Sequence, residues 1–146
     1  MIQIRTKDRE WALEAWKRIN ANLDGPKHFG PDFNLEKPPG EAWWEIVRDD
    51  VSIGMTWVRR FTKGGEVMNC GRALFPEIRG KHLNEGLRPY INEAIWAAYP
   101  AARTVIVIVY STNPYTLNWV KTTAPEIGVI PTGDSTMHIF LVGERS

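Results

Sequence analysis

The sequence contains a single cysteine, Cys70, among its 146 residues. One cysteine cannot form a disulfide within the chain, so nothing in the composition calls for an oxidising compartment. A chain of this length, with 43% hydrophobic residues, buries roughly 68% of the surface of its unfolded form and needs no metal or cofactor to fold. Length and composition therefore predict one domain over residues 1–146.

Long apolar runs and an excess of charge are missing as well. No stretch approaches the roughly 18 residues of a membrane span, and Arg5 follows the first residues too closely for a signal peptide. Lys and Arg total 18 against 17 Asp and Glu, a net charge of +1. This balance argues against a nucleic-acid binder with a broad basic surface. The expectation is a cytoplasmic protein without a membrane partner.

The sequence also lacks metal-binding and hydrolase motifs. Its three histidines, His28, His82 and His138, are far apart and have no cysteine or carboxylate at metal-ligand spacing, so no metal site is expected. Neither Gly-x-Ser-x-Gly nor a P-loop pattern occurs, so hydrolase and nucleotide-triphosphatase classes have no support.

Tryptophan, by contrast, is abundant, with seven residues. Trp43 and Trp44 are adjacent, so on a strand their side chains face opposite sides of the sheet. One of them then belongs to the core. The other lies on the outer face, either against the loop over 24–40 or as part of a partner surface.

Hydrophobic periodicity predicts an α/β (α+β) fold with a mixed, mostly antiparallel sheet and three helices. The Pro- and Gly-rich stretch 24–40 has no periodicity and is predicted to be a long loop. Pro89 implies either a kink in a helix over 83–99 or a helix start near Arg88. The order is β-α-β-β-β-α-β-α-β-β, with strands around 2–4 and over 42–48, 52–61, 66–74, 104–110, 127–132 and 137–142, and helices over 9–23, 83–99 and 113–122.

One tract between a strand and a helix has the composition of an anion site. Pro76 ends the strand, and Pro-Glu-Ile-Arg-Gly-Lys-His-Leu leads into the helix. Backbone N–H groups and the positive end of the helix dipole favour a phosphate at such a place. Gly80 allows the backbone to come close, while Arg79 and Lys81 add positive charge. The alternative is a solvated basic turn with no ligand.

At these residues the chain resembles the GNAT superfamily of acyl-CoA-dependent N-acyltransferases, and the resemblance covers nearly all of the element order. The family motif, Gln or Arg, two residues, Gly, one residue, then Gly or Ala, falls on Glu77, Gly80 and His82, of which only Gly80 agrees. The resemblance implies a GNAT-like fold that uses acetyl-CoA as co-substrate. The binding residues that it implies are Leu74, Phe75, Arg79, Gly80, Lys81, His82, Leu83 and Asn113.

The resemblance also implies direct transfer of an acyl group from its thioester to an amine of a small molecule or a protein. A backbone N–H freed by a bulge in the strand, near Leu74 or Phe75, would polarise the thioester oxygen. Asn113, at the start of its helix, would hydrogen-bond the pantetheine arm. The acceptor is shaped in this family by regions that correspond to residues 24–40 and 133–135.

The proton-transfer groups are also assigned by resemblance. Glu66 stands where some members place the general base, and its alternative interpretation is an exposed turn residue beside two glycines. The family often places its general acid, a tyrosine, at the position that holds Val120 here. Tyr110 and Tyr115 are the nearest substitutes.

Two hypotheses therefore remain open. The first is an N-acetyltransferase that acts on an unknown amine. The second is a catalytically inactive GNAT-fold binding or assembly protein, as in some bacteriophages, which would form a homo-oligomer or a complex with a protein partner. Departures from the family pattern at His82, Asn84, Pro89 and Val120 motivate the second hypothesis.

Overall fold

The computed structural model describes residues 1–145 and contains one seven-stranded sheet of order β1-β2-β3-β4-β5-β7-β6. Neighbouring strands are antiparallel except β4 and β5, which are parallel, so the predicted mixed, mostly antiparallel sheet is confirmed. The strands are β1 (Ile2–Lys7), β2 (Ala42–Arg48), β3 (Val51–Arg60), β4 (Val67–Leu74), β5 (Thr104–Tyr110), β6 (Glu126–Thr132) and β7 (Ser135–Glu144).

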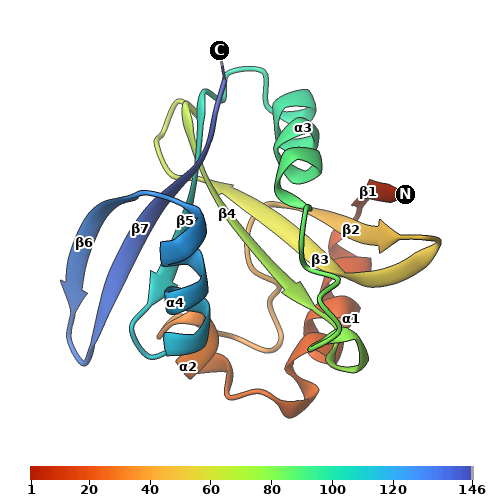
Figure 1. The fold of residues 1–146 in the computed structure, drawn as a ribbon, viewed down its shortest axis with the longest axis horizontal. Helices are drawn as coiled ribbons and strands as arrows, with labels where there is room; N and C mark the ends of the chain where they lie inside the picture. Colours follow the sequence, from red (N-terminus) through yellow and green to blue (C-terminus); the bar gives the residue numbers. More distant parts are fainter. Residues whose placement is uncertain (146) are drawn as a thin grey trace.

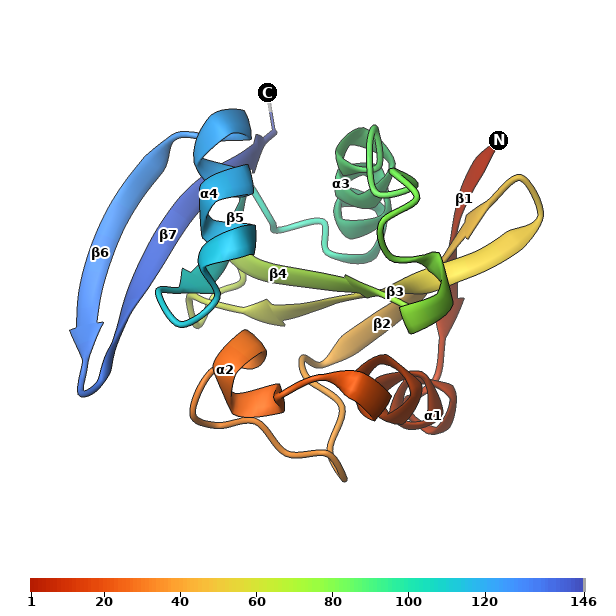
Figure 2. The same ribbon diagram turned by 60° about the horizontal axis from the view of Figure 1, so that its bottom comes forward.

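Helices cover both faces of the sheet (Figure 1). Figure 2 shows α1 and α2 on one face and α3 and α4 on the other. Within residues 1–145, no helix is both long and apolar enough to cross a bilayer. The helices are α1 (Arg9–Ile19), α2 (Gly25–Phe29), α3 (Arg88–Ala98) and α4 (Pro114–Thr123), with short 3-10 turns at Asn20–Asn22 and Pro76–Ile78.

The starts of the long helices follow local capping chemistry. Asp8 caps α1 by accepting a hydrogen bond from the Trp11 N–H at 2.9 Å, and Asn113 caps α4. Helix α3 begins at Arg88, so Pro89 lies in its first turn, where a missing N–H costs no intrahelical bond. The second of the two alternatives for Pro89 is therefore correct, and the helix is not kinked there.

The segment 24–40, predicted to be a long loop, contains the short helix α2, which stands beside the three predicted helices. Asp24 caps the five-residue helix α2 by accepting from the Lys27 N–H, and Pro26 presets its first turn. A helix this short has no hydrophobic period to detect. Two tryptophan N–H groups hold the rest of the segment, since Trp16 donates to the Asn34 carbonyl at 3.0 Å and Trp43 to the Pro39 carbonyl at 2.6 Å.

Aromatic packing explains much of the tryptophan excess. Trp16 lies 5.5 Å from Trp57 and 4.6 Å from Phe29, measured between ring centroids, so α1, α2 and β3 share one aromatic cluster. Trp44 is buried, whereas the half-buried Trp43 lies against the 24–40 segment. The expectation that the two adjacent tryptophans divide between core and outer face is thus confirmed.

Gly71 on β4 tests how tightly this cluster is packed. An added Cβ at Gly71 would lie 2.5 Å from the Trp57 indole, so Gly71→Ala should destabilise the fold by about 1–3 kcal/mol through overpacking. Gly128→Ala is the matched control, because its Cβ would meet only Ile139 at an ordinary 3.4 Å. The free energies of unfolding from urea denaturation compare the two variants. Equal stabilities would show that the Trp57 indole can move aside.

Candidate functional site

The sheet opens between its two parallel strands. β4 and β5 pair only through Val67 with Thr104, Met68 with Val105, and Asn69 with Ile106. Beyond these pairs β4 continues along β3 to Leu74, and β5 continues along β7 to Tyr110. The two strands diverge past this point (Figure 1), and the place where their backbones separate is called the β4–β5 opening below.

The backbone of β4 presents unpaired groups to this opening. Phe75 donates to the Ile53 carbonyl at 2.9 Å and Phe61 to the Val67 carbonyl at 2.8 Å, so the odd-numbered residues of β4 bond to β3. In an antiparallel ladder the intervening residues direct their N–H and C=O groups to the other side. The peptide groups of Arg72 and Leu74 therefore face the opening, where β5 has already left the ladder.

This geometry corrects the expected bulge. The register between β3 and β4 runs without a shift from Met68 to Leu74, so no bulge frees a backbone N–H in this stretch. The Phe75 N–H is already bonded to β3. The Leu74 N–H is exposed to the opening by strand divergence, which sequence patterns do not reveal.

The basic loop before α3 does not direct its arginine into the opening. Arg79 donates to the Ile19 carbonyl of α1 at 2.6 Å, on the opposite face of the sheet from α3. Partial burial lowers the pKa of Arg79. Gly80 has a φ of +80°, and a Cβ added there would have no neighbouring atom within 4 Å. His82 is exposed and lies 3.6 Å from the Glu85 carboxylate.

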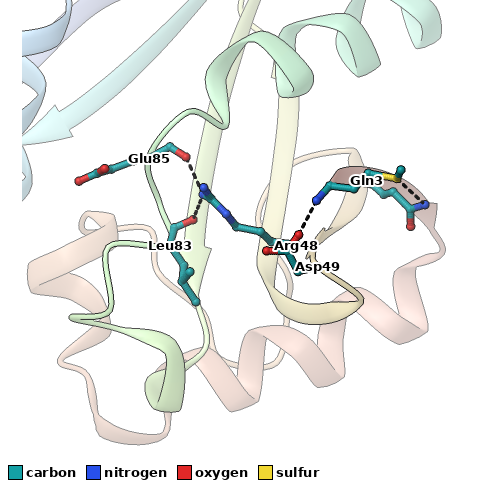
Figure 3. A network of polar contacts seen from close by, with 6 residues as sticks. Gln3, Arg48, Asp49, Leu83 and Glu85 are labelled. Atoms are coloured by element: carbon teal, nitrogen blue, oxygen red, sulfur yellow. Dashed lines mark hydrogen bonds and ion pairs between the residues drawn. The ribbon is translucent and has the colours of Figure 1, made fainter.

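Arg48, at the end of β2, fixes the next part of this loop (Figure 3). Its Nη1 donates to the Leu83 carbonyl at 2.9 Å and to the Glu85 carbonyl at 2.7 Å. Asp49 beside it pairs with the chain's amino terminus, which lowers the pKa of the Asp49 carboxyl. The loop is therefore held at the β1–β2 side of α3, with its carbonyls occupied by a cation.

Two other arginines do converge on the opening. Arg72 extends from β4 and lies over the Trp119 ring of α4, with its guanidinium carbon 5.7 Å from the ring centroid. Arg88, the first residue of α3, donates to the Cys70 Sγ at 3.6 Å. Nη1 of Arg72 is buried without a hydrogen-bond partner, and within residues 1–145 no carboxylate forms an ion pair with either arginine.

This environment is unfavourable for a positive charge. Burial lowers the pKa of Arg72 to about 10, and the charge of Arg88 acts in the same direction. Cys70 opposes the shift to a smaller extent. Arg72 remains charged at neutral pH, so the fold keeps a partly buried cation that has no ion-pair partner among residues 1–145.

The candidate acids lie at very different places. Tyr110 ends β5 half-buried and packs on Gly30, where an added Cβ would lie 2.5 Å from the Tyr110 ring. Burial raises the pKa of Tyr110, and the Asp32 carboxylate adds to that rise. Tyr115, in contrast, is 85% exposed on α4. Of the two tyrosines, Tyr110 is the one set at the edge of the opening.

Glu66 and Asn113 already have structural partners. Glu66 precedes β4 at its paired end, about 25 Å along the strand from Leu74 at the usual rise per residue. The backbone N–H of Glu66 lowers the pKa of its own carboxyl, and the Thr62 hydroxyl, which donates to the carboxylate at 2.9 Å, adds to this effect. The Asn113 side chain accepts from the Thr116 N–H as the cap of α4. The structure does not bring Glu66 to the opening.

Sequence reasoning overlooked Arg72 and Arg88, although a signal was present. Met68, Cys70 and Leu74 alternate on one face of the predicted strand, and Arg72 is the charged member of that apolar series. A charge on the buried face of an interior strand is costly and points to a functional position. Within residues 1–145, no cluster of three His, Cys, Asp or Glu side chains is placed to hold a metal ion.

No protein-family model matches this sequence, and no curated protein sequence matches it. The fold, however, is similar to solved enzymes. Mutant forms of the spermidine/spermine N-acetyltransferase SpeG from Vibrio cholerae match with a TM-score of 0.65 at 14% identity, over 97% of this chain and 92% of theirs. The aminoglycoside acetyltransferase AAC(6')-Ib, in complex with coenzyme A and kanamycin, matches with a TM-score of 0.69 at 11% identity, over 99% of this chain and 95% of its own. The chain therefore has the GNAT fold, which confirms the predicted resemblance at the level of fold.

The buried charge of Arg72 predicts a stability effect. Arg72→Met removes an uncompensated cation and keeps an apolar side chain of similar length, so it should raise the free energy of unfolding by about 1–2 kcal/mol at neutral pH. Above about pH 10 the native arginine loses its charge in the folded state first, so the wild type gains stability and the difference shrinks. Urea denaturation at several pH values measures the difference in the free energy of unfolding between Arg72→Met and the wild type.

Arg59→Met on the neighbouring strand β3 is the control, because Arg59 is exposed. Its effect should stay within about 0.5 kcal/mol. A loss of stability in Arg72→Met would mean that the Trp119 contact outweighs the desolvation of the charge.

Proposed function

We propose that this protein is an acyl-CoA-dependent N-acetyltransferase that moves an acetyl group from acetyl-CoA directly to an amine. The observation that carries the proposal is the β4–β5 opening, where the peptide groups of Arg72 and Leu74 have no strand partner. The pantetheine arm of acetyl-CoA is an extended chain with two amides, so it can pair with this edge much as another strand would. The shared fold with solved N-acetyltransferases supports the same assignment.

The chemistry follows from groups at this edge. The acceptor nitrogen forms a bond to the acetyl carbon, the C–S bond breaks, the amine gives up a proton and the sulfur takes one. An N–H of β4 that faces the opening, with Leu74 as the candidate, would donate to the thioester oxygen as negative charge develops there. Gly80, Lys81 and His82 belong to the loop that leads into α3, and the resemblance to this fold proposes that the loop backbone comes close to an anionic group of the donor.

Tyr110 is the proposed general acid for the sulfur. Its pKa lies above the ordinary tyrosine value, so it is protonated at neutral pH and can supply a proton. Glu66 lies at the paired end of β4, which leaves an ordered water or the nearby Asp32 as the more direct acceptor of the amine proton. Tyr115 remains the alternative acid, at a more exposed position.

The acceptor side is assigned to the 24–40 segment. The Thr112 hydroxyl donates to the Lys27 carbonyl at 2.8 Å, and Gly30 packs on Tyr110, so α2 is fixed below the end of β5. Asp32 places a carboxylate close to Tyr110, which suits an ammonium group. The alternative of an inactive assembly protein has no observation of this kind in its favour.

Tyr110→Phe tests the acid. The expected loss in kcat is about 100-fold, the lower end of general acid catalysis, with little change in the Kd of acetyl-CoA. Release of free thiol in the presence of spermidine or kanamycin reports the rate, and Tyr115→Phe is measured in parallel to separate the two tyrosines. Tyr90→Phe, a surface tyrosine of α3, is the matched control.

Isothermal titration with acetyl-CoA decides the broader proposal. No detectable heat of binding near millimolar ligand would refute an acetyl-CoA-dependent enzyme. Binding without turnover on any amine would instead favour the binding-protein hypothesis.

A further inference from the structure

We infer that the acceptor is an amine with an apolar body and a single ammonium group, held on a sheet face that continues from Tyr110 across β7 to β6. The inference rests on the proposed function, because it places the acceptor beside the proposed acid. It deepens that function by naming the class of amine and a residue, Ile130, that selects it. The face is called the apolar platform below, and its side chains are Ile108, Ile130, Met137, Ile139 and Leu141.

Strand register places the platform next to Tyr110. Tyr110 pairs with Met137 of β7, and Met137 pairs with Ile130 of β6, so their side chains form one row across three strands. Paired residues of an antiparallel ladder have their side chains on the same face of the sheet. Tyr110 packs on Gly30 at the end of α2, so the row lies on the face that α1 and α2 cover. The neighbouring rows continue this face with the pairs Ile108 with Ile139 and Ile106 with Leu141.

The platform lies beyond the reach of the helices on its face. Helix α2 lies against β5, and among residues 1–145 no helix on this face extends over β6 (Figure 2). Ile130 is therefore 45% exposed, and Ile108, Met137 and Leu141 are half-buried. Single exposed apolar side chains are common, whereas a contiguous set of them is typical of a binding surface.

The other face of the same hairpin has a different character. Val129, next to Ile130 in sequence, pairs with His138, and the His138 ring lies 2.7 Å from the Glu126 carboxylate. That face carries ionisable groups, although Val129 is as exposed as Ile130, at 53% against 45%. The uncharged surface thus belongs to the face that holds Tyr110, and it is not a general property of an exposed hairpin.

A carboxylate at one end of the platform supplies the complementary charge for an ammonium group. Asp32 follows Gly30 by two residues, and an added Cβ at Gly30 would lie 2.5 Å from the Tyr110 ring. An ammonium held by Asp32 would leave the apolar body of the same molecule to lie along the platform. A second ammonium on that body would meet uncharged apolar side chains, where its desolvation is costly. The arrangement therefore favours a monoamine over a diamine.

The test compares hexylamine with 1,6-diaminohexane, which has the same chain length and a second ammonium group. We expect kcat/KM for hexylamine to exceed that for the diamine by at least about tenfold, because the second charge has no partner on the platform. Release of free thiol from acetyl-CoA reports the rates. Isothermal titration with each amine, with and without CoA, measures binding independently of turnover.

Two substitutions on adjacent residues locate the platform. Ile130→Lys adds a positive charge to it and should raise the KM of hexylamine about tenfold with little change in kcat. Val129→Lys is the matched control, because Val129 has similar exposure on the opposite face, and it should leave both amines unchanged. Asp32→Asn should weaken both amines alike. Circular dichroism verifies the fold, and Ile130→Thr, which keeps a β-branched side chain, decides if Ile130→Lys fails to fold.

The outcomes separate this inference from the proposed function. Equal kcat/KM values for the two amines, or an unchanged KM in Ile130→Lys, would keep the acetyl transfer and overturn the apolar acceptor. Hexylamine binding that depends on Ile130, without turnover, would support the platform and refute the acetyl transfer. Binding of neither amine would overturn the platform even if acetyl-CoA binds. A dimer that Ile130→Lys dissociates, measured by analytical ultracentrifugation, would assign the face to a second copy and also overturn the inference.

Discussion

The divergence of β4 and β5 after a few residue pairs is the constraint on which the rest of this molecule depends. Because the strands separate, the interior splits into two hydrophobic clusters. The larger one joins α1, α3 and β2 to β4, and the smaller one joins α4 to β5 and β7 through Val109, Leu117, Val120 and Phe140. A continuous ladder would have paired the peptide groups of Arg72 and Leu74 with β5.

Besides the β4–β5 ladder and the bond from Asn92 to the Val142 carbonyl, some contacts cross the divide next to the opening. On the α3 and α4 face, Arg72 of β4 meets Trp119 of α4. On the opposite face, Gly30 packs on Tyr110 and Thr112 binds the Lys27 carbonyl. A ligand bound at the opening would meet some of the residues that join the two halves, so its binding would stabilise the fold.

Much of the fold could be predicted from sequence because it depends on local chemistry. Asp8 and Asn113 are N-cap residues at the starts of α1 and α4. The run from Thr104 to Tyr110 is apolar because helices cover both faces of β5. The short helix α2 escaped detection because five residues carry no period. The β4–β5 opening was not predicted either. It depends on the register between strands that are far apart in the sequence, and no local pattern encodes that register.

The candidate site was less predictable than the fold. Gly80 and its basic neighbours were identified from their position between a strand and a helix. That position does not determine where a side chain points, and Arg79 points to α1. The arginines that do reach the opening, Arg72 and Arg88, are distant in sequence and meet only when β4 and α3 fold together. The signal for Arg72 was a charged residue within an apolar alternation; the sequence shows this pattern, but it does not show what the side chain meets in the fold.

The two faces of the opening differ in a way that orders the proposed reaction. Arg72 and Arg88 lie on the face covered by α3 and α4, while Tyr110 and Asp32 lie on the face covered by α1 and α2. In the proposed reaction, the positive charges would attract an anionic donor to the first face, and the carboxylate would attract a cationic amine to the second. The reacting atoms would then meet between the strands. Opposite charges on opposite faces would keep each substrate from occupying the other's position, which a single pocket of one charge could not do.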